Sequence, residues 1–212
     1  MVIICNIQSI RSALCIYLDD GERYWIHKDD LKYADFQPGI TYNKENFLQQ
    51  ISVLQYPRAL NLAVSMLAKR PCSENEIRQK LLRRKFIPDV TELVIYKLKK
   101  EHLLNDHDFC EQWVRYRTGC KYGPRVIRTE LRMKGISDDI ILSVLEKLDE
   151  EDNFNNALSL SFKYWKKKKP DEDIQKSRRR VISALVRKGY DWSTAQKACD
   201  MAESEIKNNC ME

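Results

Sequence analysis

Two histidines and a cysteine near the middle of the chain have residue types that could bind a metal ion. His102, His107 and Cys110 follow the spacing H-x4-H-x2-C, at a junction between two predicted helices. A zinc site there would need a fourth ligand and a matched tetrahedral geometry. We therefore expect a solvated helix junction at this position, with no metal bound.

A run of four acids at residues 149–152 could bind Mg²⁺ in a nuclease, but no other carboxylates converge on it at a motif spacing. We interpret the run as a solvated helix end and linker. The sequence also lacks a Gly-rich phosphate loop, a G-x-S-x-G elbow and an H-E-x-x-H pair. We expect a non-enzymatic protein without a cofactor, and a metal-dependent nuclease is the alternative.

Basic side chains are the residues that could recognise a phosphate backbone or an acidic protein surface. The chain has 37 Lys and Arg against 31 Asp and Glu, a formal charge of +6. The basic residues concentrate in two regions, and the second contains the insertion Lys166-Lys167-Lys168-Lys169-Pro170. Such a concentration predicts a positive stripe along one side of the molecule, with ordinary solvated faces as the alternative. The candidate contacts are Arg115, Arg117, Lys121, Arg125, Arg128, Arg132, Lys166, Lys167, Arg178, Arg179, Arg180, Arg187 and Lys188.

Aromatic residues beside these cations could add base stacking to the phosphate contacts. Phe109, Trp113 and Tyr116 are spaced i, i+4 and i+7, which favours core packing on one helix. Tyr122, Tyr164 and Trp165 are the better candidates for exposed contacts, because they lie next to basic residues in the sequence.

The composition places the chain in a reducing compartment. Seven cysteines is an odd number and none forms a C-x-x-C pair, so we expect reduced thiols. The apolar stretches are far shorter than the ~20 residues that cross a bilayer, and the first residues do not have the features of a signal peptide. We expect a cytoplasmic monomer with no membrane contact.

The elements that position these residues are of two kinds. Residues 2–10 and 13–18 alternate as strands do, and Asp20-Gly21 before a third apolar run predicts a hairpin. From about Pro57 the apolar period becomes helical, with Val64 and Leu93 among the residues predicted to face inward. Only 12 residues are Gly or Pro, which favours long helices.

The helical pattern repeats three times. Ile77 and Leu81 match Ile127 and Leu131 at an offset of 50, and Leu131 matches Leu185 at an offset of 54. We predict a mainly α fold in which tandem three-helix repeats form an elongated, curved body after a small N-terminal β unit. The expected division is 1–52 for the β unit and 53–104, 105–152 and 153–212 for repeats one, two and three.

A specific motif runs through the second repeat, with the residues Leu104-Asn105-Asp106, Phe109-Cys110, Val114, Arg117, Gly123-Pro124, Ile127, Glu130-Leu131 and Lys134-Gly135-Ile136. This motif resembles the signature of the RecX family, whose members regulate the RecA recombinase. The resemblance covers about 57–205 and extends to Ser73, Glu76, Ile77, Lys80 and Leu81 in the first repeat. Departures from the family pattern are Asn105, Cys110 and Lys85, the last at a position where repeats two and three have Gly.

The resemblance implies a regulator that binds RecA and the RecA–single-stranded-DNA filament along its groove. Such proteins depress ATP hydrolysis, strand exchange and stimulated repressor cleavage, and so restrain recombination and the SOS response. Weak non-specific DNA binding would accompany this activity. The alternative is a direct DNA-binding protein of the helix-turn-helix type.

Overall fold

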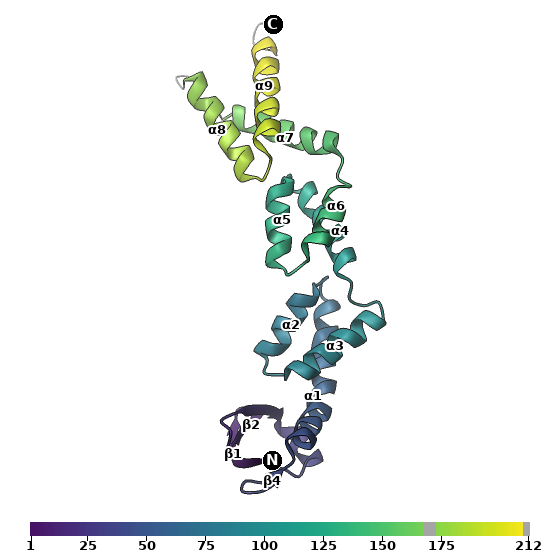
Figure 1. Ribbon diagram of the computed structural model, residues 1–212. Helices are drawn as coiled ribbons and strands as arrows, with labels where there is room; N and C mark the ends of the chain where they lie inside the picture. The colour runs from purple at the N-terminus through teal and green to yellow at the C-terminus, as the bar shows by residue number, and fades with distance from the viewer. Residues whose placement is uncertain (168–172, 210–212) are drawn as a thin grey trace. The chain divides into compact units, whose positions relative to one another are not determined.

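The computed structural model describes residues 1–167 and 173–209, and it forms two compact units. The first unit is Met1–Asn105, and the second begins at Asp106 (Figure 1). Among the described residues, no helix has both the length and the apolar content that crossing a membrane requires. The third and fourth lysines of the basic insertion and Pro170 lie outside the described residues.

The first unit opens with a four-stranded antiparallel sheet in the order β3-β2-β1-β4. The hairpin predicted at Asp20-Gly21 is confirmed: Gly21 has a φ of +84°, and strands β2 and β3 pair on either side of it. The bounds are β1 Val2–Ile10, β2 Ala13–Leu18, β3 Arg23–His27 and β4 Thr41–Tyr42, with a 3₁₀ helix, η1, at Lys28–Tyr33.

Three helices complete the first unit: α1 Lys44–Leu67, α2 Glu74–Arg83 and α3 Pro88–Lys100. A capping box starts α2, because the Ser73 hydroxyl accepts from the Glu76 amide while the Glu76 carboxylate accepts from the Ser73 amide. The expected end of the β unit, at residue 52, falls inside α1, which is one continuous helix that also passes through Pro57. The sheet and the first repeat therefore share a helix.

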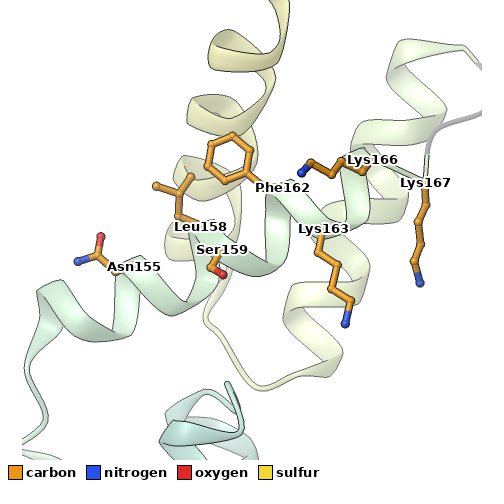
Figure 2. Close-up of a pocket in the computed structure, with 7 residues that line it drawn as sticks. All are labelled: Asn155, Leu158, Ser159, Phe162, Lys163, Lys166 and Lys167. Atoms are coloured by element: carbon orange, nitrogen blue, oxygen red, sulfur yellow. The ribbon is translucent and has the colours of Figure 1, made fainter. Parts of the chain in front are cut away.

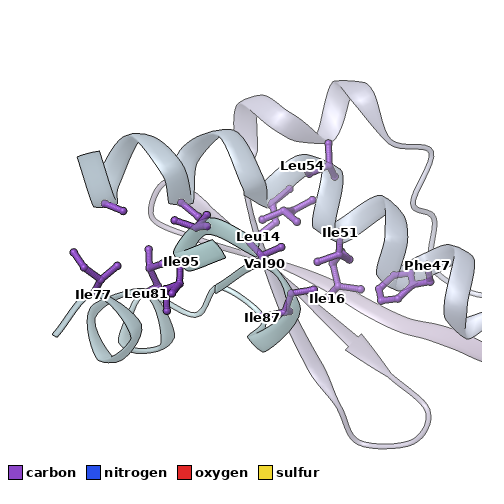
Figure 3. Packing of buried hydrophobic residues seen from close by; sticks show 14 of the residues in the cluster. Leu14, Ile16, Phe47, Ile51, Leu54, Ile77, Leu81, Ile87, Val90 and Ile95 are labelled. Carbon is purple, nitrogen blue, oxygen red and sulfur yellow. The ribbon is translucent and has the colours of Figure 1, made fainter. Parts of the chain in front are cut away.

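One hydrophobic core joins the sheet to the first repeat. Figure 3 shows Leu14 and Ile16 of the sheet near Ile51 of α1, in the same cluster as Leu81 of α2 and Val90 of α3. A sheet of this size cannot bury enough apolar surface alone. It is stabilised by docking on the helices of its own chain.

The predicted inward positions are mostly buried, with two exceptions. Val64 is 43% exposed and Leu93 is 51% exposed, so both predictions were wrong. The buried face of α1 follows Ile51, Ala59 and Ala63, and Val64 lies ~100° further around the helix. The apolar stripe in the sequence is wider than the face that packing covers.

The second unit contains two further three-helix groups. The first is α4 Asp106–Gly119, α5 Pro124–Met133 and α6 Asp138–Leu145; the second is α7 Glu150–Trp165, α8 Ile174–Arg187 and α9 Trp192–Asn209. Each group has its own buried cluster, around Ile127 and Leu131 in the first and around Leu185 and Tyr190 in the second. The tandem three-helix repeats and the N-terminal sheet are thus confirmed.

The turn after the middle helix has the same backbone shape in every repeat. Lys85, Gly135 and Gly189 all have positive φ, at +68°, +79° and +99°. Glycine adopts this left-handed conformation readily, whereas lysine rarely does. The first repeat therefore has the same left-handed turn as the other two, although lysine stands at position 85 where they have glycine.

Candidate functional site

The turn that follows α8 caps the start of α5. Gly123 makes no side-chain cap, and its amide donates instead to the carbonyl of Lys188 at 2.9 Å. The Arg125 amide donates to the carbonyl of Gly189 at 3.1 Å. Amides in the first turn of a helix lack partners within the helix, so the third repeat satisfies donors of the second. The two repeats meet backbone to backbone.

A buried tyrosine fixes the same contact from the third repeat. Tyr190 is fully buried, and its hydroxyl donates to the Lys121 carbonyl at 3.2 Å. Burial raises the pKa of the Tyr190 hydroxyl to about 12, so the proton that makes this bond is retained at neutral pH. Lys121 itself has a φ of +58°, and its ammonium group bonds the Ser159 hydroxyl on α7.

Tyr122 lies between two cations at this contact. The Arg117 guanidinium and the Lys188 ammonium are each 3.7 Å from the centre of its ring. Hydrogen bonding to Lys188, and then to Arg117, lowers the pKa of the Tyr122 hydroxyl below its ordinary value of 10. Cations over aromatic faces attract the ring electrostatically, so Tyr122 links repeats two and three.

Basic residues from five segments lie at this contact or next to it. We name the set Arg117, Lys121, Arg125, Lys163 and Lys188 the junction cluster. Lys163 lies one helical turn after Ser159 on α7 and is exposed, so it shares a face with the residue that Lys121 contacts. The backbone bonds above bring Arg125 and Lys188 to the same junction.

An open groove of ≈ 650 Å³ along α7 continues this positive surface. Its lining includes Lys163, Lys166 and Lys167 together with Leu158 and Phe162. Figure 2 shows the Lys163 and Lys167 side chains extended away from the helix and Lys166 reaching beside Phe162. No acidic residue lines the groove among the described residues. The combination suits a polyanion.

The remaining candidate cations are spread over several environments. Arg132 bonds Asp138 at 2.7 Å, and Arg128 lies half-buried on the same helix. Arg115 and Arg187 are exposed, on α4 and α8 respectively.

The run 178–180 does not form one face. Arg178 forms ion pairs with Asp200 and Glu203 of α9 and is half-buried. Arg179 is exposed, whereas Arg180 is half-buried. Successive helical residues differ by ~100° in direction, which explains the separation. Of the three arginines, only Arg179 is exposed on the surface.

The sequence did not predict that the Arg117 side chain is largely buried and ion-paired. Its side chain is 16% exposed and is ion-paired to Glu130, which also accepts from the Trp113 indole at 3.1 Å. The i, i+4 pattern of Phe109 and Trp113 does predict this packing, and the two rings stack with centroids 6.1 Å apart. Arg117 therefore stabilises the junction and contributes little exposed charge.

The aromatic predictions were partly wrong. Trp165 is 6% exposed and Tyr164 packs against the core of the third repeat, so neither is an exposed contact. Tyr116, which was predicted to be core, is 60% exposed. Tyr164 and Trp165 were predicted to be exposed because lysines follow them in the sequence. At a helix end, however, one residue can be buried while the next one is in solvent.

The acidic run caps a helix, and the cysteine of the H-x4-H-x2-C pattern is buried. Asp149 caps α7 by accepting from the Glu151 amide at 2.8 Å, and the other acids lie in the first turn, where negative charge is favoured. Cys110 is fully buried, and burial raises the pKa of its thiol to about 11. Within 1–167 and 173–209, no group of three His, Cys, Asp or Glu residues could hold a metal ion.

The fold defines a protein made of tandem three-helix domains behind a small antiparallel sheet. Models of the first, second and third three-helix domains of RecX match residues 59–98, 105–145 and 150–199. The chain belongs to the RecX family of regulatory proteins.

The named relatives agree with this assignment. The regulatory protein RecX of Mycolicibacterium smegmatis is 32% identical over 156 residues, which are 71% of this chain and 81% of the relative. The regulatory protein RecX of Clostridium perfringens strain 13 is 30% identical over 195 residues, which are 92% of this chain and 90% of the relative. A crystal structure of regulatory protein RecX, 22% identical, has the same fold with a TM-score of 0.65, covering 94% of this chain and 100% of that one.

Proposed function

We propose that this protein binds the cognate RecA recombinase in its filament on single-stranded DNA and inhibits the filament's activities. It would depress ATP hydrolysis, strand exchange and stimulated repressor cleavage in the cytoplasm, and so restrain recombination and the SOS response. Membership of the RecX family supports a regulatory role. The proposal needs no catalytic residue, because a protein that occupies the filament groove can block subunit motion.

The junction cluster is the observation that carries the proposal. Its cations come from both repeats of the second unit and are held by backbone bonds to Gly123 and Arg125. Because these bonds already fix the backbone that carries the cations, a polyanion binds without the entropic cost of ordering that backbone. A nucleoprotein filament presents phosphates and acidic protein side chains, and both complement this surface.

We further propose that the segments 1–52, 53–104, 105–152 and 153–212 act as the units of a monomer, with α1 shared by the first two. The second and third repeats would contact the filament, because they contain the candidate cations. The sheet would stabilise the first repeat, on which it packs.

Co-sedimentation with RecA–single-stranded-DNA filaments tests the proposal. The wild type should sediment with filaments at low salt and dissociate as salt rises. The double variant Lys121→Glu/Lys163→Glu should stay in the supernatant at salt concentrations where the wild type still sediments. Lys69→Glu/Lys100→Glu is the control, since it makes the same charge change at two exposed residues of the first unit. Equal sedimentation of all three proteins would contradict a role for the junction cluster.

A direct DNA-binding protein remains the second candidate, because each repeat is a three-helix group with cations on its middle helix. In the second repeat, however, Arg132 of α5 is bonded to Asp138 and Arg128 is half-buried. Few cations of α5 are thus available to read base edges. Sequence-selective binding to duplex DNA without RecA would favour this candidate over the first.

A further inference from the structure

A pocket in the first unit has walls from three different parts of the chain. It has a volume of ≈ 310 Å³ and lies between the sheet, α1 and the turn after α2. Trp25 of β3 and Phe86 of the turn provide aromatic walls, and both are half-buried. Arg84 and Lys85 line it from the turn and are exposed. The pocket therefore combines flat apolar surface with positive charge.

A single buried amide holds the walls in place. Gln55 is 3% exposed, and its Nε2 donates to the Trp25 carbonyl at 2.6 Å and to the Lys85 carbonyl at 3.4 Å. Its Oε1 accepts from the Ile87 amide at 2.8 Å. Trp25 and the turn at 84–86 are thus tied to α1 through one side chain. A pocket with fixed walls binds without reorganisation.

The charge of the pocket is positive at its turn side. Arg58 also lines it, but its guanidinium is bonded to Asp30 at 2.6 and 3.0 Å, so those two charges offset each other. Arg84 and Lys85 supply the remaining charge. His27, a third lining residue from β3, accepts from the Asp29 amide and faces the Asp29 carboxylate at 3.2 Å.

Lys85 occupies a backbone conformation that favours glycine. Its φ is +68°, and the equivalent positions of the other two repeats are Gly135 and Gly189. A strained residue that the surrounding structure holds in place is often found at a functional site. Here the strained residue adds a cation to the mouth of a pocket that has aromatic walls.

We propose that this pocket binds one nucleotide of single-stranded DNA, with the base against Trp25 and Phe86 and the phosphate at Arg84 and Lys85. Every base has a flat face that stacks on an aromatic ring, so such a site is indifferent to sequence. The volume lies at the lower end of the range for small-ligand pockets and suits one nucleotide. The site belongs to the first unit and does not depend on the function proposed for the junction cluster.

Photo-crosslinking in the absence of RecA tests the contact directly. The probe is a fluorescein-labelled oligo(dT) that carries 5-iododeoxyuridine, irradiated with the full-length protein and digested with trypsin. We expect crosslinked bases on the peptides that contain Trp25 and Phe86. Crosslinks found only on peptides of the second unit, or no binding of the probe by the wild type, would overturn the proposal.

The variant Lys85→Gly separates binding from folding. It removes a cation and gives the turn the residue that repeats two and three have, so we expect the melting temperature to hold or rise by about 2 °C. The salt dependence of probe affinity should become shallower, by about 0.7 in the slope of log K against log salt for one lost phosphate contact. The control Lys100→Gln removes one exposed charge from the same unit but outside the pocket.

The outcomes distinguish this site from the proposed regulation of RecA. An unchanged slope and unchanged crosslinks in Lys85→Gly would contradict the nucleotide site, whatever the protein does to RecA. If Lys85→Gly bound the probe normally but lost affinity for RecA filaments, the pocket would bind an acidic protein surface, and the nucleotide proposal would be wrong.

Discussion

The backbones of Gly123 and Gly189 are in direct contact. A Cβ atom added at Gly123 would lie 2.5 Å from the carbonyl carbon and oxygen of Gly189, a distance that real Cβ atoms essentially never show. A Cβ added at Gly189 would lie 2.6 Å from the Val126 nitrogen. Both neighbours are backbone, so no side chain can move aside to make room. The two glycines allow the second and third repeats to share the hydrogen bonds that position the junction cluster.

Gly123→Ala should therefore separate the two repeats. The added methyl group forces a backbone shift, with an expected loss of about 1–3 kcal/mol in the free energy of unfolding. Filament inhibition should weaken in parallel, because Lys188 and Arg125 lose their common frame. Thermal denaturation and a RecA ATPase assay measure the two effects.

Gly119→Ala is the matched control for that variant. Gly119 ends α4, and a Cβ there meets nothing within 4 Å. Alanine in a helix is more stable than glycine by roughly 0.5–1 kcal/mol, so this variant should be as stable as the wild type or more so. Equal stability of Gly123→Ala and Gly119→Ala would show that the glycine contact is not required.

Tyr122 should ionise at a lower pH than an ordinary tyrosine. Lys188, and then Arg117, stabilise the phenolate and lower the pKa of its hydroxyl. The hydroxyls of Tyr24 and Tyr190, with pKa values of about 12, should ionise last. In an ultraviolet absorbance titration, Tyr122→Phe should remove an early step and Lys188→Gln should move that step to higher pH. A titration curve that Lys188→Gln leaves unchanged would place the ammonium group away from the ring.

Arg178 and Arg179 of α8 should differ in how much their replacement lowers the free energy of unfolding. Arg178→Gln removes the ion-pair partner of Asp200 and one of the two partners of Glu203, which is 12% exposed and keeps Lys207, so unfolding should become easier by about 1–2 kcal/mol. Arg179→Gln should change stability by less than about 0.5 kcal/mol, because the side chain is exposed.

Urea denaturation of the two variants and their affinity for RecA filaments provide the comparison. Weaker filament binding is expected for Arg179→Gln. If Arg178→Gln were as stable as Arg179→Gln, the α8–α9 ion pairs would contribute nothing measurable.

Gln55 should matter more to stability than other glutamines of α1. Gln55→Leu leaves the Trp25 carbonyl and the Ile87 amide without their hydrogen bonds, at an expected cost of about 2–4 kcal/mol for the buried groups together. Gln50→Leu, at an exposed position of the same helix, should cost far less. Equilibrium unfolding measures both. A small effect at Gln55 would mean that the sheet docks on α1 through apolar contacts alone.

Local signals in the sequence predicted much of the fold. Asp20-Gly21 predicts the hairpin because both positions of its turn tolerate positive φ, and Ser73 with Glu76 predicts the start of α2. The matches of Ile77 with Ile127 and of Leu131 with Leu185 are pairs of fully buried residues. These features depend on residues close together in the chain or on a repeat, and so they are visible without coordinates.

Continuity of α1 could not be predicted in the same way. Pro57 removes one backbone hydrogen bond and usually ends or kinks a helix, at a cost of ~3 kcal/mol. Here it lies on the exposed side of α1, where water can satisfy the carbonyl that loses its donor. Burial of Ile51 before the proline and of Ala59 after it holds both halves in one helix.

The candidate site was predicted by residue type but not by environment. The sequence indicates that cations concentrate in repeats two and three, yet it does not show that Arg117 and Arg178 use their charge inside the fold while Lys163 and Arg179 are exposed. Partners such as Glu130 and Glu203 are 13 and 25 residues away along the chain. Tertiary packing decides which cations remain available for binding.

The rate of ATP hydrolysis by the cognate RecA on single-stranded DNA tests the central claim most directly. The wild-type protein should slow hydrolysis, and Lys121→Glu/Lys163→Glu should restore most of the rate at the same protein concentration while retaining its helical circular dichroism. A rate that the wild type leaves unchanged, or that both proteins slow equally, would contradict the account.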